Sequence, residues 1–552
     1  MRETTNSSLP VAVARPASGY VSDVAYPRAF VPQITPPTLR LVAALNGYPA
    51  PPEHDFDYCD LGCATGDTLV TLAAANPGAR FVGVERNGDH VRTGRGRVER
   101  GGLRNVRFVE RDFEELGSAD GEVPPLFDFI VAHGIWSWVS PRKRDAILAF
   151  VRSHLKPGGL FYLSYNALPG WSSVEPLRRL MLENTAARGT TLERAREGVQ
   201  LAQRLADSGA AYFASHPTAK SMLALMQKGG LPYVAHEYFH ADWQPMYFAD
   251  VARSLANSDP RPEGDVGDPA PGPLAFLGQV PLYANVRELA IPPSLKKIAE
   301  SVPDRIALEG LKDFATNELF RCDVYVRGKV SRSVSETQYY FEGTPFGTLA
   351  PLAHVKREVR LPFYTVEYKE PIYEALLAAI AEHACTAMTL MSVPELAALG
   401  QLRVGDCLQS LVLGGQVVPM AGAPAPAHVS SGGSSDDGKG LRIVLPYNEL
   451  VLEEALAEEG PLVFASPVLG AGVQVSLLEA LCIRLVTDPS LSREAYPDKV
   501  RDYARSRPMP ISIGDRKIKD ADELVRVMAR EIERFRTSSL AKLVELGVLG
   551  VA

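Results

Sequence analysis

The fold is decided by residues 57–76, which read DYCDLGCATGDTLVTLAAAN. A short apolar run at 57–61 leads into a turn of small residues, and an apolar helical pattern follows at 68–76. This order is typical of the first strand–turn–helix unit of a parallel α/β sheet. Small residues in the turn let the backbone approach a ligand closely, and the amides that open the helix point toward it. The sequence therefore predicts a ligand site at residues 60–66.

The same alternation continues on both sides of this unit. Further strands are predicted at 81–85, 106–110, 127–133 and 160–166, and helices at 38–48, 88–101 and 141–155. Short apolar runs that alternate with amphipathic segments indicate βαβ units with right-handed crossovers. We therefore expect an α/β, Rossmann-like domain over residues 38–175.

The remainder of the chain has a different character. Helices are expected over 175–228, aromatic residues gather at 229–253, and 254–273 is rich in Pro, Gly and Asp, which predicts a mobile loop. Residues 408–420 (LQSLVLGGQVVPM) indicate a small hairpin after helices, as in a winged-helix-like unit, and a helix is expected at 520–545. We expect residues 1–19 to be disordered. The predicted division is an N-terminal arm at 1–37, the Rossmann-like domain at 38–175, a helical or mixed middle domain at 176–330, a partly winged-helix-like domain at 331–420, a linker at 421–440 and a mixed α/β C-terminal domain at 441–552.

Composition narrows the class of protein. A length of 552 residues predicts about three to four domains. The net charge of −7 argues against a protein that coats nucleic acid, so we expect no nucleic-acid partner. Among the six cysteines, Cys59 and Cys63 are close in sequence, and no second cluster completes a zinc site, which indicates a reduced, cytoplasmic chain. No apolar run is long enough for a signal peptide or a membrane span.

Acidic residues after successive strands point to the ligand. Glu85 ends the second strand, where it can accept hydrogen bonds from both ribose hydroxyls of NAD or of S-adenosylmethionine. Asp112 and Phe113 follow the third strand, where an acid can accept the adenine amino group and an aromatic ring can cover the base. Asp60 lies close to the expected cofactor amine. Taken singly, Glu85 is equally well a solvated strand end and Asp112 a helix N-cap. Together with the LKPGG turn at 155–159, the set favours S-adenosylmethionine.

Several other segments resemble one known family. They are Tyr26-Pro27 with Gln33 and Pro36, residues 132–139 (AHGIWSWV), 164–171 (SYNALPGW), 236–239 (HEYF), 247–250 (YFAD), 320–328 and 465–470 (ASPVLG). Together they resemble bacterial class I methyltransferases that carry a methyltransferase regulatory domain. The resemblance implies protein-lysine methylation of outer-membrane proteins. The chain departs from the family at 33–37, where it reads QITPP in place of a Gln-Thr-His-Pro-Asp pattern, and its loop at 254–273 is longer.

Candidate catalytic residues follow from the sheet edge. His133 ends the fourth strand, where it can touch the cofactor or take a proton, and the alternative is a structural histidine. Trp138 can line a target channel or pack in the core. Tyr165 and Asn166 end the fifth strand, where they can orient an amine or form a turn. Tyr238 can close the active site or pack against the domain. A metal at His236, Glu237 and His240 is disfavoured, because methyl transfer needs none and the His-Glu-x-x-His order is missing.

The arm is expected to fold over the cofactor through Tyr20, Tyr26 and Gln33, or else to pack outside the sheet. The predicted cofactor-binding residues are Tyr20, Tyr26, Gln33, Asp60, Gly62, Cys63, Gly66, Glu85, Arg86, Asp112, Phe113 and His133. More than 300 residues lie beyond the cofactor domain, which favours a macromolecular substrate and hence a protein-lysine N-methyltransferase. A small-molecule methyltransferase and a non-catalytic protein that senses S-adenosylmethionine are the alternatives.

Overall fold

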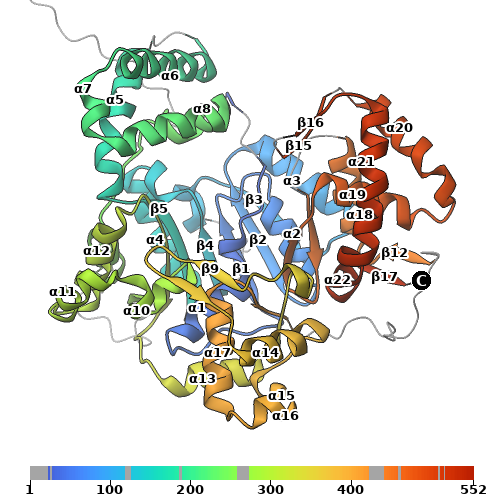
Figure 1. Cartoon of the computed structure of the whole chain (residues 1–552). Coiled ribbons are helices and arrows are strands. Elements are labelled where there is room, and N and C mark those ends of the chain that lie inside the picture. Colours follow the sequence, from blue (N-terminus) through green and yellow to red (C-terminus); the bar gives the residue numbers. More distant parts are fainter. Residues whose placement is uncertain are drawn as a thin grey trace, which may run out of the picture.

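The computed structural model describes residues 23–24, 28–118, 126–185, 189–257, 273–421, 440–457, 462–507, 510–514 and 516–551. A central sheet carries the helical unit α5–α8, the unit α13–α17 and the C-terminal unit on different sides (Figure 1). The expectations for residues 1–19, for Tyr20 and Tyr26, and for most of the loop at 254–273 and of the linker at 421–440 fall outside the described residues.

The central sheet has seven strands in the order β3-β2-β1-β4-β5-β7-β6. Strands β1 to β5 pair in parallel, while β7 runs antiparallel to both β5 and β6. The bounds are β1 Asp57–Leu61, β2 Arg80–Glu85, β3 Val106–Glu110, β4 Phe127–Ala132, β5 Leu155–Asn166, β6 Leu274–Gln279 and β7 Phe320–Arg327. The predicted Rossmann-like fold is confirmed. Strands β6 and β7, which the sequence assigns to a middle domain, complete the same sheet.

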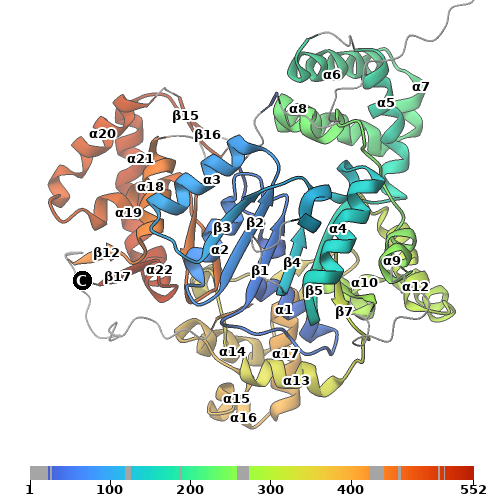
Figure 2. The same cartoon turned by 180° about the vertical axis from the view of Figure 1, so that it is seen from behind.

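Helices cover both faces of this sheet, as the view from behind also shows (Figure 2). On one face lie α1 (Pro36–Leu45), α2 (Asp67–Ala75) and α3 (Gly88–Arg100), whose apolar side chains share a core with Tyr58 and Phe81. On the other lie α4 (Pro141–His154) and α9 (Phe248–Asn257). Because successive strand residues point to opposite faces, Cys59 packs on the α4 side while its neighbour Tyr58 packs on the α2 side.

A helical unit follows β5 and packs around its own core. Its helices are α5 Glu175–Glu183, α6 Thr191–Asp207, α7 Ala211–Ser215 and α8 Pro217–Tyr238. Helix α8 breaks at Gly230, whose φ of 80° is left-handed, and Pro232 follows the break. The break redirects the segment that carries residues 236–240. The chain then returns to the sheet through α9, α10 (Arg287–Ala290), α11 (Lys296–Glu300) and α12 (Arg305–Thr316).

Residues 331–420 form a mixed unit with a separate core. Its helices are α13 Val334–Gly343, α14 Pro371–Glu382, α15 Ala387–Leu390, α16 Pro394–Ala397 and α17 Gln401–Leu413. The hairpin predicted at 408–420 is wrong, because Leu408, Leu411 and Val412 are buried on one face of α17. Strand β11 (Val418–Pro419) instead pairs with β8 (Phe346–Gly347), and the hairpin of this unit is β9 (Glu358–Arg360) with β10 (Thr365–Glu367).

The C-terminal unit packs on helix α2. Asn76 donates to the Gly470 carbonyl (2.9 Å), and Thr71 and Tyr447 share a buried hydrogen bond of 2.8 Å. The predicted C-terminal helix is confirmed as α21 and α22, with a π-helical turn at Phe535–Ser539 between them. The elements are β12 Leu441–Ile443, α18 Pro446–Ala457, β13 Val463–Ser466, β14 Ala471–Gln474, α19 Leu477–Thr487, α20 Tyr496–Ser506, β15 Ile511–Ile513, β16 Arg516–Ile518, α21 Ala521–Arg534, α22 Leu540–Glu545 and β17 Leu549–Val551.

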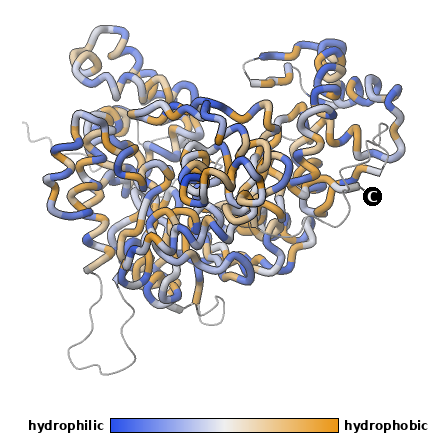
Figure 3. The backbone as a smooth tube through the Cα atoms, turned by 60° about the horizontal axis from the view of Figure 1, so that its bottom comes forward, coloured by the Kyte–Doolittle hydropathy of each residue, from blue (hydrophilic) through white to orange (hydrophobic). Residues whose placement is uncertain are grey.

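Hydrophobic and hydrophilic stretches alternate along the backbone (Figure 3). Within the described part of the chain, no helix combines the length and the apolar character that a membrane crossing requires.

Candidate active site

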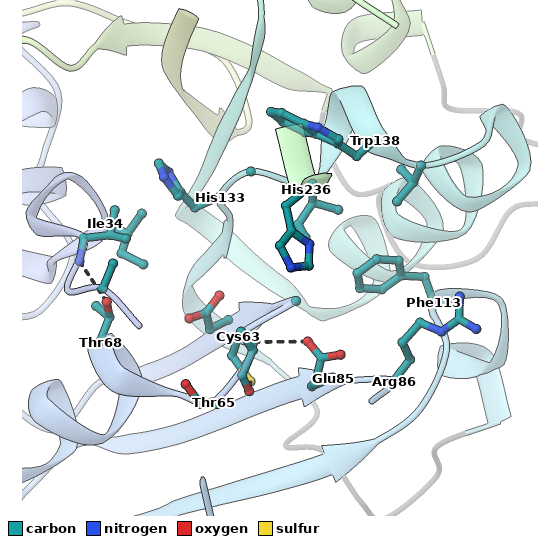
Figure 4. A pocket seen from close by; sticks show the side chains of 18 of the residues that line it. Ile34, Cys63, Thr65, Thr68, Glu85, Arg86, Phe113, His133, Trp138 and His236 are labelled. Atoms are coloured by element: carbon teal, nitrogen blue, oxygen red, sulfur yellow. Dashed lines mark hydrogen bonds between the residues drawn. The ribbon is translucent and has the colours of Figure 1, made fainter. Parts of the chain in front are cut away.

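A cavity of about 330 Å³ lies at the carboxyl ends of the parallel strands, where open α/β sheets bind their ligands. Its lining comes from the turn after β1, from the ends of β2, β3 and β4, from the N-terminal arm and from the segment after the break in α8. Figure 4 shows Trp138 and His236 across the cavity from Cys63 and Glu85. The cavity therefore joins the Rossmann-like domain to the helical unit.

The turn after β1 has an unusual backbone. Gly62 (φ 82°), Ala64 (φ 47°) and Gly66 (φ 72°) all adopt left-handed conformations. A Cβ on Gly62 would lie 2.3 Å from Ile135 Cδ1, and one on Gly66 would lie 2.3 Å from Phe108 Cζ. Both positions therefore require glycine, because the backbone has a positive φ and a side chain would clash with its neighbours. Ala64 occupies the position where a glycine is usual. Its left-handed backbone is held in place because its amide donates to Glu85 Oε2 (3.1 Å).

Two buried acids face this turn. Glu85 also accepts a hydrogen bond from the Asn87 amide (2.8 Å), so the end of β2 fixes its carboxylate beside the turn. Asp60 lines the cavity, and burial together with the charge of Glu85 raises the pKa of Asp60 to about 7. A cationic group in the cavity would relieve this unfavourable charge. Cys63 lines the same wall.

The third wall carries the cations of the cavity. Its lining includes the cations Arg86, Arg111 and Lys143 and the aromatic ring of Phe113. Asp112 is turned toward Lys143 Nζ (2.5 Å) and Arg86 (3.6 Å). Burial alone would raise the pKa of Asp112, but the hydrogen bond and charge of Lys143, together with the Glu114 amide and Arg86, hold this pKa below its ordinary value. Phe113 thus reaches the cavity directly, whereas Asp112 is engaged by its neighbours.

His133 lies in the cavity wall as a neutral side chain. Its Nδ1 is 3.0 Å from Tyr162 Oη and 3.2 Å from Ser164 Oγ, and Ser164 also accepts from the Gly134 amide (2.8 Å). Burial lowers the pKa of His133 to about 4. The ring is therefore uncharged near pH 7 and is fixed by hydrogen bonds to β5.

The helical unit supplies the opposite wall. Trp138 Nε1 donates to the Glu237 carbonyl (3.4 Å), and Asn166 Nδ2 donates to Glu237 Oε1 (3.1 Å). Burial raises the pKa of Glu237 to about 7. The lining on this side also includes His236, His240, Asp242 and Phe320. Glu237, Asp242 and Phe320 were not predicted as site residues, although Glu237 stood in a conspicuous polar and aromatic segment.

Three of the predicted catalytic residues, Tyr165, Asn166 and Tyr238, do not line the cavity. The Tyr165 hydroxyl donates to the buried Asp323 (2.7 Å), and the Tyr238 ring packs 5.7 Å from Trp171 in the core of the helical unit. Because side chains alternate along β5, Asn166 and Ser164 share one face of the strand, and Tyr165 points to the other face. Asn166 contacts the cavity lining through its hydrogen bond to Glu237. The sequence pair Tyr165-Asn166 thus cannot act as one unit.

The N-terminal arm covers part of the cavity. Ala29, Val31 and Ile34 line it, and the Val31 amide donates to Thr68 Oγ1 (2.9 Å). Gln33 lies in the short helix η1 (Pro32–Ile34) without lining the cavity. The arm was predicted to act through polar and aromatic residues, but its described cavity contacts are apolar. The described residues hold no group of three or more His, Cys, Asp or Glu side chains placed to bind a metal.

Comparison with known proteins identifies this arrangement. A methyltransferase-domain model matches residues 53–210, and a model described as a predicted methyltransferase regulatory domain matches residues 231–259. The uncharacterized protein sll1526 of Synechocystis is 30% identical over 467 residues, which cover 84% of this chain and 87% of that protein. The chain belongs to this family of methyltransferases with a regulatory domain.

More distant relatives match part of the chain in sequence or nearly all of it in fold. The uncharacterized protein RP789 of Rickettsia prowazekii is 26% identical over 56% of this chain and 53% of its own length. The solved structure of PKMT2 from Rickettsia typhi has a TM-score of 0.65 at 17% identity and covers 93% of this chain and 99% of that chain. PKMT2 in complex with AdoHcy has the same TM-score at 18% identity, with 93% and 98% covered. The predicted cofactor is confirmed, and the protein is an S-adenosylmethionine-dependent methyltransferase.

Proposed function

We propose that the protein is a protein-lysine N-methyltransferase that acts on outer-membrane or surface proteins. The observation that carries the proposal is the composition of the cavity, in which the Rossmann-like turn faces a wall with an aromatic ring and carboxylates, Trp138, Glu237 and Asp242. Carboxylates and aromatic faces attract an ammonium group. The sequence resemblance to protein-lysine methyltransferases and the shared fold with PKMT2 support the same substrate class.

The cofactor fits the wall nearest the sheet. Ionised Asp60 would pair with the amino group of the cofactor, and Glu85, whose carboxylate is fixed by two backbone amides, would accept from the ribose hydroxyls. Phe113 would cover the adenine ring. S-adenosylmethionine supplies an activated methyl group on a sulfonium. The chain's own part is to position the two reactants and to exclude water.

The remaining residues prepare the acceptor. A lysine must be neutral to attack, and a partly buried site lowers its pKa. Trp138 is fixed by its hydrogen bond to Glu237, and Phe320 lies on the same side of the cavity. Ala29, Val31 and Ile34 of the arm keep water from the cofactor side. These residues would orient the amine and exclude water from the site.

Transfer of a labelled methyl group tests the proposal. The full chain is incubated with methyl-labelled S-adenosylmethionine and a bacterial outer-membrane protein fraction, and the label is followed by gel and by mass spectrometry. We expect label in proteins, abolished by Glu85→Ala and retained in Glu99→Ala, an exposed acid on α3. Label confined to small metabolites would contradict the proposal and favour a small-molecule methyltransferase. Cofactor binding without transfer to any component would favour a non-catalytic sensor.

A further inference from the structure

Glu237 stands out among the residues that line the cavity. It lies on the segment after the break in α8, it is half-buried, and it lines the same cavity as Asp60 and Glu85. One carboxylate oxygen accepts from Asn166 Nδ2 (3.1 Å), at the end of β5. Helix and sheet together hold this acid at the wall opposite the cofactor turn.

Charge is distributed unevenly around the cavity. Its cationic side chains come from the segment after β2, from the segment after β3 and from α4; they are Arg86, Arg111 and Lys143. The wall formed by residues 236–242 contributes Glu237 and Asp242 and no lysine or arginine to the described lining. The positive charge of the cavity thus lies beside Phe113, and the helical wall carries negative charge without a lysine or arginine. Asp60 and Glu85 place further negative charge at the turn after β1. If the cofactor amine pairs with Asp60, the helical wall is left to receive a second cationic group, that of the acceptor.

We propose that Glu237 binds the ammonium group of the acceptor lysine and takes its proton before methyl transfer. This inference rests on the proposed function. Glu237 would be a catalytic residue of the proposed methyltransferase, because its carboxylate would contact the substrate nitrogen directly. Trp138, held against the Glu237 backbone, would cover the alkyl chain of the same lysine.

The chemistry balances without a further reactant. The proton leaves the lysine ammonium for the Glu237 carboxylate, which gives a neutral amine and a carboxylic acid. The nitrogen lone pair then forms the new N–C bond as the S–C bond of the sulfonium breaks, and the electron pair stays on sulfur. The products are a methylammonium group and S-adenosylhomocysteine. Glu237 returns its proton to solvent as the product leaves.

Other polar groups of the cavity are less suited to this role. The Nδ1 of His133 already faces Tyr162 and Ser164, and burial lowers the pKa of His133 and of His240 to about 4. Both imidazoles are therefore weak proton acceptors at neutral pH. Burial instead raises the pKa of Glu237 to about 7, close to the pH at which a general base works well. The charged and titratable groups around it are Arg178 of α5, Tyr233 and Tyr238 of α8, and the neighbouring histidines, His236 and His240.

Binding of n-butylammonium, a mimic of the lysine side chain, tests the inference without knowledge of the protein substrate. Calorimetry on the complex with S-adenosylhomocysteine should show affinity that falls as the pH drops through about 7, because protonated Glu237 loses its charge. Glu237→Gln should weaken butylammonium about tenfold and remove this pH dependence, while S-adenosylhomocysteine still binds. Glu197→Gln, an exposed acid on α6, is the matched control.

The outcomes separate the two proposals. Butylammonium affinity that is equal in wild type and Glu237→Gln, or independent of pH in the wild type, would overturn the role of Glu237 even if proteins are methylated. Butylammonium binding that depends on Glu237 while the outer-membrane proteins stay unlabelled would leave Glu237 as the amine-binding group and overturn the proposed substrate. Methylation of proteins at the wild-type rate by Glu237→Gln would also overturn the inference.

Discussion

Arg28 and Glu454 form an ion pair of 3.2 Å that joins the N-terminal arm to the C-terminal unit. Arg28 also contacts Asp67 at 2.8 Å, the first residue of α2, and the next residue of the arm, Ala29, lines the cavity. Glu454 binds Arg97 (3.3 Å) and Arg100 (3.1 Å) of α3 as well. A residue more than 420 positions away in sequence therefore holds the arm against the cavity.

The C-terminal unit should accordingly influence cofactor binding. Glu454→Gln removes the charge that holds Arg28, and the arm then covers the cavity less tightly. We expect the affinity for S-adenosylhomocysteine to fall about fivefold, which is the effect of a single partly exposed ion pair. Calorimetry measures it, and Glu453→Gln, an exposed neighbour on the same helix, is the control. If Glu454→Gln and Glu453→Gln bind S-adenosylhomocysteine equally well, the contact between Arg28 and Glu454 does not affect cofactor binding.

Cofactor binding should depend on pH through Asp60. The pKa of Asp60 is raised to about 7, so the free protein is partly protonated there at neutral pH. If the cofactor amine pairs with ionised Asp60, binding expels this proton, and affinity rises with pH up to about 7 and then levels off. Below pH 7 the slope approaches about tenfold per pH unit. Asp60→Asn should bind more weakly and lose this slope, and a variant that keeps it would disprove the pairing.

Phe113 should contribute through the adenine ring. Phe113→Ala removes the aromatic surface of the cavity wall, and stacking of a base on an aromatic side chain is worth about 1–3 kcal/mol. We expect S-adenosylhomocysteine affinity, measured by calorimetry, to fall by about 5-fold to 150-fold. Tyr339→Ala, which changes an exposed ring on α13, should leave the affinity unchanged. An unchanged affinity in Phe113→Ala would place the adenine elsewhere.

A buried ion cluster anchors β7 to α12. Arg321 is fully buried and contacts Asp323 (2.8 Å), Asp313 (2.5 Å) and Glu309 (3.3 Å). Arg321→Met would leave buried carboxylates without their cation, which destabilises the fold by about 3–5 kcal/mol. Urea denaturation should show a lower midpoint, whereas Arg179→Met, which breaks an exposed pair, should leave the midpoint unchanged. Equal midpoints would mean that the cluster adds nothing to stability.

The sequence predicted the Rossmann-like half well, because apolar runs and the glycine turn leave local signals. It did not predict that β7 pairs with β5, since that pairing joins strands more than 150 residues apart in sequence. The prediction of a hairpin at 408–420 was wrong because a short apolar run has the same pattern in a strand and in a buried helix. The helical spacing of Leu408, Leu411 and Val412 was the signal that could have corrected it.

At the site, the polar residues at strand ends were the predictable part. Asp60, Glu85, Phe113 and His133 line the cavity, as does Trp138. Residues brought in from other units were not predictable, because Ala29 and Val31 are ordinary apolar residues. Glu237 is recognisable as a cavity residue once the break at Gly230 has turned its segment toward the sheet.

The atom that receives the methyl group tests the central claim most directly. Outer-membrane proteins labelled by the full chain are hydrolysed, and the labelled amino acids are identified by mass spectrometry. The account predicts label on the side-chain nitrogen of lysine, with the yield strongly reduced by Glu237→Gln and maintained by Glu197→Gln. Label on carboxylate oxygen, on arginine or on cysteine sulfur would contradict it.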